Sequence, residues 1–307
     1  MIDAASVSTV AVAMLAGSLR VSTPFLFVSL GECLTEKSGR INLGNEGVLV
    51  LGAMVAYAIS YHTGSPWLGV LAAALAGMLL GGAHGAICAL TRVSDVAMGI
   101  AIMLAGTGIA FFFGKPYVQP TAPLLPTIPL GFWSDLPQVK SALAVSPLFF
   151  IGILAAVLLH WVLRTTRMGL RVRIVGDSED AARALGLPIA RIRLLATAAG
   201  SGLAGIGGAF LSLCYPGSWN EGLSSGQGLM AVALVVFSRW NPLTCIAAAL
   251  LFGAAGALGP SLQTVGVTQG YYLFYAAPYV VTLVILVLTV LPGRSLRGMP
   301  GELSIGR

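Results

Sequence analysis

Long apolar stretches separated by short polar ones dominate the chain. Nine stretches have the composition of membrane or buried helices, at about residues 8–31, 44–62, 67–91, 96–114, 147–165, 191–214, 228–238, 243–262 and 271–292. A helix needs about 20 mostly apolar residues to cross a bilayer, so 228–238 is too short to cross alone. Arg20 and Pro24 interrupt the first stretch, which leaves open one kinked helix or a surface helix followed by a short span. The pattern predicts an all-α, polytopic membrane protein with eight to ten transmembrane helices.

Composition supports this class. The chain is 57% hydrophobic and 9% charged, whereas soluble domains carry about 25% charged residues. The 39 glycines fall within the apolar stretches, where small residues let helices approach closely in lipid. The four cysteines are scattered without the spacing of a metal site, so we expect no metal. We expect one transmembrane domain over 1–307, with a first half at about 8–115 and a second at about 147–292.

The basic residues predict which helix ends face the cytoplasm. Seven arginines fall between 164 and 193, which makes the loop at 166–190 the cytoplasmic anchor. Strict alternation of spans from this anchor puts 14 of the 17 basic residues on the same side, together with the C-terminus. The proline-rich loop at 116–146 then lies outside. We expect a multi-pass protein of the cell (inner) membrane that contacts lipid. Its positive charge follows from this topology, and we expect no binding of nucleic acid.

A weak internal repeat joins the two halves. The segment "LGNEGVLVLGAM" precedes "SPWLGVLAAALAGMLLGGAHG", and "SGQGLMAVALVV" similarly precedes "NPLTCIAAALLFGAAGALGP". In the predicted topology the two copies have opposite orientations. Inverted repeats of this kind are typical of transporters, with the substrate site near the repeat interface.

The arginine-rich loop contains a short predicted helix, "DSEDAARALGLP". Asp177 or Ser178 can cap its start, and acidic residues in the first turn suit the helix dipole. Gly186 and Pro188 are placed to end it. Such a short helix needs a surface to dock against, so it is either part of a solvated loop or a coupling helix that binds a soluble partner. The coupling residues would be Ser178, Glu179, Asp180, Arg183 and Gly186.

Three segments resemble the permeases of ATP-binding cassette (ABC) importers. The segment "GLRVRIVGDSEDAARALGLPIARIRLLATAAGSGLAGIGGAFLSL" is similar to the family's coupling region, and "LGECLTEKSGRINLGNEGVLVLGAM" resembles the signature of permeases for nucleosides and related compounds. The segment "SSGQGLMAVALVVFSRWNP" follows the family pattern except that Ser238 replaces a usual glycine. The Asp-Leu-Ser-Val-Gly type sequence of the sugar permeases does not occur at the corresponding place.

This resemblance implies an assembly. A second homologous permease would pair with this chain as a heterodimer, a cytoplasmic ABC ATPase would bind both, and an extracytoplasmic substrate-binding protein would deliver the solute. The chain would be no enzyme and would hold no cofactor, because ATP and Mg²⁺ bind the ATPase. The nearest approach to a phosphate-binding loop, "GIAFFFGKP", has five residues between its glycines where the motif needs four, and Pro116 replaces Ser/Thr.

Polar residues at the starts of two apolar stretches are the candidates for the substrate path. Asn42, Asn45 and Glu46 either cap a helix and lock it to its neighbours or line the path, since ionisable residues in membranes tend to mark function. The second patch offers Trp219, Asn220, Ser224, Ser225 and Gln227. Amides, hydroxyls and a ring suit a neutral ligand such as a nucleoside. The alternative is an ion-gradient-driven secondary transporter of a small polar solute, for which a coupling helix has no purpose.

Overall fold

The computed structural model describes residues 4–90, 93–130, 143–263, 274, 276–290 and 298–305. Helices account for most of these residues, with one antiparallel strand pair, β1 (Ile128–Pro129) and β2 (Ala144–Val145), among them. The helices are α1 (Ala4–Lys37), α2 (Asn45–Thr63), α3 (Pro66–Cys88), α4 (Asp95–Gly114), the 3-10 turn η1 (Lys115–Tyr117), α6 (Pro147–Thr165), α7 (Arg167–Asp177), α8 (Glu179–Ala184), α9 (Ile189–Leu213), α10 (Gln227–Phe237), α11 (Pro242–Gln263), α13 (Ala277–Val290) and α14 (Gly301–Ile305).

The predicted all-α membrane architecture is confirmed. Each predicted apolar stretch carries a helix, although most of 271–276 lies outside the described residues. The first stretch is one helix, α1, which contains Pro24. Six helices in the described part of the chain are long and apolar enough to cross a membrane: Met14–Lys37, Pro66–Cys88, Asp95–Tyr117, Pro147–Thr165, Ile189–Leu213 and Pro242–Gln263. The expected count of eight to ten also included α2, α10 and α13, which do not belong to this set.

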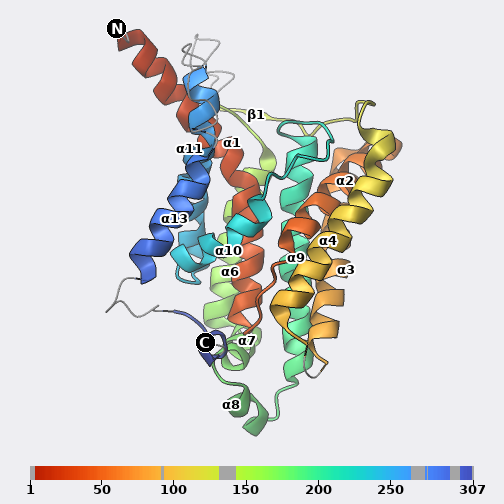
Figure 1. The fold of residues 1–307 in the computed structure, drawn as a ribbon, viewed down its shortest axis with the longest axis vertical. Coiled ribbons are helices and arrows are strands. Elements are labelled where there is room, and N and C mark those ends of the chain that lie inside the picture. Colours follow the sequence, from red (N-terminus) through yellow and green to blue (C-terminus); the bar gives the residue numbers. More distant parts are fainter. Residues whose placement is uncertain are drawn as a thin grey trace.

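The helices pack around a central pair, α1 and α9, which lie near the middle of the bundle (Figure 1). α1 packs against α9 at the centre, α3 packs along α9, and α11 packs along α1. In the same way α4 lies beside α2, and α13 lies beside α10. In the C-terminal half of α2, Tyr57 and Ser60 donate hydrogen bonds to the 120–123 loop. The chain just after α10 lies at the other end of the bundle, where Trp240 donates to Glu36 near the C-terminal end of α1. The sequence repeat therefore corresponds to a repeat of helix packing.

Glycine permits the close crossing of α1 and α9. A Cβ atom on Gly31 would overlap the carbonyl oxygen of Gly200, and a Cβ on Gly200 would overlap the carbonyl oxygen of Gly31. Gly52 meets the backbone of Gly205 in the same way where α2 packs on α9. Packing through small residues is how helices associate where lipid supplies little hydrophobic drive between them. The glycine-rich apolar stretches of the sequence therefore form the helix contacts.

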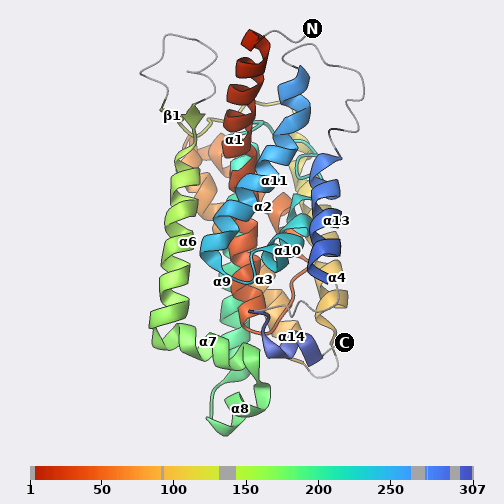
Figure 2. The ribbon, with the colours of Figure 1, turned by 90° about the vertical axis from the view of Figure 1, so that its left-hand side faces the viewer.

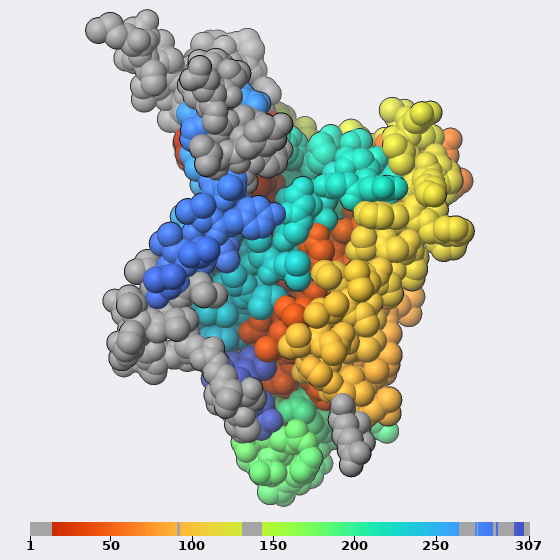
Figure 3. All heavy atoms as spheres, in the orientation of Figure 1, coloured from red at the N-terminus to blue at the C-terminus, as the bar shows by residue number. Residues whose placement is uncertain are grey.

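The outer surface of the bundle is apolar. On α3 the side chains of Leu68, Leu71, Leu75 and Leu79 are exposed at helical spacing. α4 covers much of the face that Figure 3 shows and exposes apolar residues along its length. α6 likewise exposes Leu154, Val157, Leu158 and Trp161. A continuous apolar surface of this kind suits the hydrocarbon core of a bilayer.

One end of the bundle carries most of the described basic residues. α7 and α8 lie at this end, and α8 projects beyond the other helices (Figures 1 and 2). Both belong to the segment with the arginine cluster. Lys37 and Arg193 lie at the same end, since Lys37 donates to the carbonyl oxygen of Gly298 and Arg193 donates to that of Ser38. Lys115 follows α4, which starts at this end and runs away from it. Arg92, Lys140, Arg294, Arg297 and Arg307 lie outside the described residues.

Candidate translocation site and coupling segment

The start of α2 is fixed by a buried polar cluster that we call the Glu32 cluster: Glu32, Asn42, Asn45 and Ser201. The Glu32 carboxylate accepts the backbone N–H of Asn42 at 2.9 Å and the side-chain amide of Asn45 at 2.6 Å. Asn42 also donates to the Ser201 hydroxyl at 3.0 Å. All four side chains are buried. The cluster holds α1, the 38–44 loop, α2 and α9 together, and satisfies polar groups that lipid cannot.

Glu46 stabilises the start of α10 rather than that of its own helix. Its carboxylate accepts the Ser224 hydroxyl at 2.6 Å, the N–H of Gly226 at 3.1 Å and the N–H of Gly228 at 2.7 Å. A Cβ on Gly228 would meet the Glu46 backbone at 2.5 Å, so glycine is required for this approach. The starts of α2 and α10, one from each inverted half, therefore meet across one carboxylate, and its negative charge suits the positive end of the α10 dipole.

A cavity of about 320 Å³ lies beside this junction. Its wall combines aromatic rings with amides and one guanidinium, contributed by α1, α9, the 214–226 loop, α10, α11 and α13. The polar and aromatic lining residues are Arg20, Phe25, Phe210, Tyr215, Asn220, Ser225, Gln227 and Tyr279. Its volume lies in the range of small-molecule sites, which combine a mostly apolar wall with a few polar groups. The side-chain oxygen of Gln227 is buried and has no hydrogen-bond partner among the described residues.

The structure divides the predicted path residues into four groups. Asn220, Ser225 and Gln227 line the cavity. Glu46 and Ser224 hold the helix start that carries Gln227, while Asn42 and Asn45 belong to the Glu32 cluster. Trp219 is buried outside the cavity lining, with its indole nitrogen against Gly114. That nitrogen has no hydrogen-bond partner in the part of the chain that the structure describes. The path role of these residues stays a prediction.

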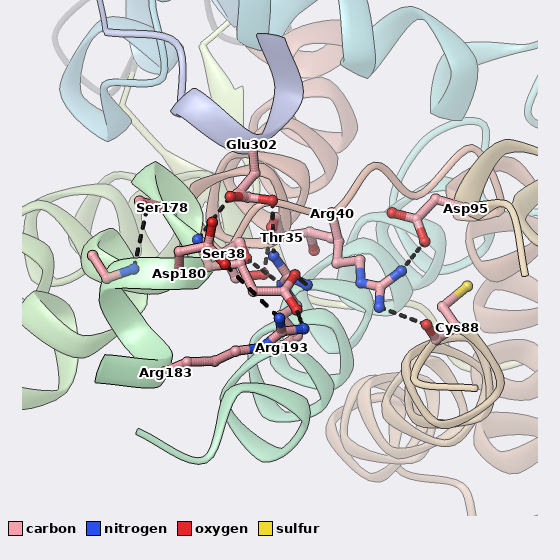
Figure 4. A network of polar contacts seen from close by, with 12 residues as sticks. Thr35, Ser38, Arg40, Cys88, Asp95, Ser178, Asp180, Arg183, Arg193 and Glu302 are labelled. Carbon is pink, nitrogen blue, oxygen red and sulfur yellow. Dashed lines mark hydrogen bonds and ion pairs between the residues drawn. The ribbon is translucent and has the colours of Figure 1, made fainter. Parts of the chain in front are cut away.

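The predicted short helix exists as α8. Ser178 caps it, because its hydroxyl accepts the N–H of Ala181 at 3.2 Å. Gly186 closes it in the left-handed region, with φ +67°. Glu179 forms ion pairs with Arg183 and with Arg193 of α9 (Figure 4). The Asp180 carboxylate lies 3.8 Å from the Arg183 guanidinium, and 96% of the Asp180 side chain is exposed.

The arginine-rich loop is more ordered than the sequence suggested, because Arg167–Asp177 forms a second helix, α7. Thr166 caps it through the N–H of Gly169 at 3.1 Å. In the loop at 166–190 the sequence predicted a helix only over "DSEDAARALGLP", although Thr166 is a residue type that caps helices.

Glu302 of α14 contacts the start of α8, and this contact was not predicted from the sequence. Its carboxylate accepts the backbone N–H of Glu179 at 2.7 Å and lies 3.6 Å from the Arg193 guanidinium. Burial alone would raise the pKa of Glu179, but the hydrogen bond and charge of Arg193, with the charge of Arg183, outweigh it and hold that pKa below 4.5. No local sequence signal links residues 123 positions apart.

Two further contacts were also missed. The Glu36 carboxylate, buried in α1, accepts the indole N–H of Trp240, which follows α10. Where α3 ends and α4 begins, the ligand atoms of His84, Cys88 and Asp95 lie within 4.8 Å of one another. Cysteine spacing alone did not reveal this second group, because Asp95 belongs to a different helix.

Comparison with known proteins identifies the class. Residues 14–291 match the family described as the permease component of the branched-chain amino acid transport system, so the chain belongs to that family. It is a membrane-spanning permease of the ABC importer class.

Individual relatives agree with this class. TsgC13 of Haloferax volcanii, provisionally described as a glucose ABC transporter permease protein, is 34% identical over 81% of this chain and 77% of its own. The nucleoside ABC transporter permease protein NupC of Lactococcus lactis is 28% identical over 90% and 91%. The guanosine ABC transporter permease protein NupQ of Bacillus subtilis is 30% identical over 91% of both chains. None of these descriptions supports a gradient-driven transporter.

Proposed function

We propose that this permease carries a nucleoside, or a related heterocyclic or sugar-like solute, into the cell. A separate ABC ATPase would drive it, a second homologous permease would pair with it as a heterodimer, and an extracytoplasmic binding protein would deliver the solute. The chain would hold no cofactor, because ATP and Mg²⁺ belong to the ATPase. The end with α7, α8 and the C-terminus would face the cytoplasm, as the positive-inside rule predicts.

The observation that carries this proposal is the connection between α8 and the cavity. Glu179 of α8 binds Arg193 near the start of α9, and Phe210 and Leu211 near the end of α9 line the cavity. Arg193 also donates to the carbonyl oxygen of Ser38, just after α1, and α1 lines the cavity further along. A movement of α8 by a docked ATPase would therefore displace α9 and α1, two of the helices that line the cavity. Rigid elements with two arrangements are the usual carriers of such coupling.

The exposed surface of α8 is suited to a docked partner. Leu185 is 64% exposed at the end of α8, and the Arg183 side chain is 66% exposed. The projecting helix thus offers an apolar residue beside a charged one at the end of the bundle (Figure 2). An apolar contact with a charged rim is the usual anatomy of a protein interface.

The cavity supports a neutral ring-bearing solute. Phe25, Phe210, Tyr215 and Tyr279 supply aromatic surfaces on which a base can stack. Gln227 supplies a buried oxygen that needs a donor, which an amino group of a base or a sugar hydroxyl would provide. The descriptions of NupC and NupQ name nucleosides and guanosine for those proteins, and this supports the same class of solute here.

Co-purification tests the assembly. Gentle detergent extraction from native membranes, followed by mass spectrometry, should recover a soluble ATPase and a second permease in stoichiometric amounts. A chain recovered alone, even after crosslinking in the presence of an ATP analogue, would contradict the proposal.

The variants Glu179→Arg and Gly186→Trp should abolish uptake while the protein remains in the membrane. Normal uptake by both variants would contradict the role of α8.

Substitution of Gln227 tests the solute site. Gln227→Met keeps the length of the side chain and removes the buried acceptor. The lost hydrogen bond should cost about 1–3 kcal/mol and so raise the KM of nucleoside uptake about 5- to 150-fold. Gln263→Met, at an exposed glutamine on α11, is the matched control and should leave KM unchanged. An unchanged KM in Gln227→Met would remove Gln227 from the site.

A further inference from the structure

Three potential metal ligands converge where α3 ends and α4 begins. His84 and Cys88 lie four residues apart on α3, so they share one face of the helix. Asp95 is the first residue of α4. One imidazole nitrogen, the Cys88 sulfur and one carboxylate oxygen all lie within 4.8 Å of one another. Such distances allow three atoms to bind one ion after small side-chain movements, because Zn²⁺ binds sulfur at about 2.3 Å and nitrogen or oxygen at about 2.0–2.2 Å.

The burial of His84 is the independent sign that this cluster takes a ligand. Its side chain has 0% of its surface exposed, yet neither ring nitrogen has a hydrogen-bond partner among the described residues. A buried polar group without a partner costs about 1–3 kcal/mol. The other two histidines do have partners, because His62 binds Tyr117 and His160 binds Asn241. A metal ion bound by His84 would supply a partner for one of the two ring nitrogens.

Arg40 fixes the geometry of the cluster from outside. It forms an ion pair with the Oδ1 atom of Asp95 and donates to the carbonyl oxygen of Cys88 at 2.5 Å (Figure 4). Charged partners of this kind orient the ligands of metal sites. Arg40 belongs to the loop between α1 and α2. The cluster therefore links that loop to the end of α3 and to the start of α4, at the arginine-bearing end of the bundle.

We propose that His84, Cys88 and Asp95 bind one divalent cation of the zinc type. Imidazole, thiolate and carboxylate together are a borderline-soft donor set that suits Zn²⁺. Binding converts the Cys88 thiol to a thiolate and releases its proton to solvent. The thiolate and the carboxylate then balance the two charges of the ion, and water completes a tetrahedral site. The ion would link the end of α3 to the start of α4.

Metal titration of the purified full-length chain tests this site. After treatment with a chelator, the chain in detergent is titrated with Zn²⁺ in a calorimeter and with Co²⁺ in a spectrophotometer. We expect one equivalent to bind, with a cobalt–thiolate charge-transfer band and a higher temperature of unfolding in the presence of Zn²⁺. Cys88→Ser should lose the charge-transfer band. His84→Gln and Asp95→Asn should weaken binding at least ~100-fold, because outer-shell partners alone contribute about 10–100-fold.

Matched variants separate this site from binding elsewhere. Cys214→Ser and His160→Gln replace the same residue types away from the cluster and should bind the metal as the unaltered chain does. Each variant is first checked for a single symmetric gel-filtration peak, and Asp95→Asn leaves both buried ligands in place if the other two variants fail to fold. The proposal is overturned if the unaltered chain binds no Zn²⁺ at micromolar concentration. It is also overturned if Asp95→Asn binds the ion unchanged and retains the same cobalt spectrum.

Discussion

Replacement of Glu46 by glutamine tests how the two inverted halves are held together. In the native chain one carboxylate oxygen accepts the Ser224 hydroxyl and the N–H of Gly226, and the other accepts the N–H of Gly228 at 2.7 Å. A glutamine can keep the first oxygen but puts an NH₂ group where the second was. The N–H of Gly228 then faces a donor, and one charge-assisted hydrogen bond is lost.

The expected cost follows from that single bond. Hydrogen bonds to charged groups contribute about 1.5–3 kcal/mol, and the lost charge at the start of α10 removes about another 0.3–1 kcal/mol of dipole stabilisation. Glu46→Gln should therefore destabilise the protein by about 2–4 kcal/mol, the sum of the two contributions. Glu46→Ala removes all three acceptors and should destabilise it further.

The midpoint of thermal unfolding in detergent measures this effect, and it is determined by gel filtration of samples heated to a series of temperatures. Glu221→Gln, which changes an exposed glutamate in the loop before α10, is the matched control and should leave the midpoint unchanged. A midpoint of Glu46→Gln equal to that of the native chain would refute the reasoning. Uptake per molecule distinguishes the roles of Glu46, since a changed KM places it on the path, whereas an unchanged KM with lower abundance leaves it as a cap.

Two further results are expected. Gly200→Ala should destabilise the protein by about 1–3 kcal/mol, the usual cost of overpacking, because the new Cβ overlaps the carbonyl oxygen of Gly31. Gly108→Ala is the control, since a Cβ at Gly108 meets nothing within 4 Å. Equal unfolding midpoints for the two variants would contradict the packing argument. Because the folded pKa of Glu179 lies below 4.5, its pairing with Arg193 stabilises the protein fully above about pH 4.5 and less as the pH falls through the folded value. The stability difference between the native chain and Glu179→Gln should accordingly shrink in acid, and a difference that grows below pH 4.5 would contradict this sign.

The sequence predicted the local features of the fold well. Helix positions agree closely because apolar runs between polar breaks define them, and the cap at Ser178 and the end at Gly186 depend only on neighbouring residues. The inverted repeat was readable because both halves retain a glycine-rich polar start before an apolar helix.

Contacts between distant segments could not be predicted in this way. Glu46 was expected either to cap the helix that carries it or to line the substrate path, whereas its hydrogen-bond partners are about 180 residues away. Glu32, which holds the start of α2, resembled any other residue of a long helix, and Trp240 gave no sign of its partner Glu36. Burial decides these pairings, because most polar groups inside the bundle find a partner in the protein, wherever along the chain the fold places one.

The bond from Glu302 to the N–H of Glu179 has a consequence for biosynthesis. α8 receives this bond from a residue 123 positions further along the chain, and chains are made at about 5–20 residues per second. For some seconds after α8 emerges from the ribosome, its first N–H group therefore lacks its partner. The docking surface that we propose for α8 takes its final form only when the C-terminal segment has been made and has folded back against α7. An ATPase that requires this form would thus bind finished permeases in preference to nascent ones.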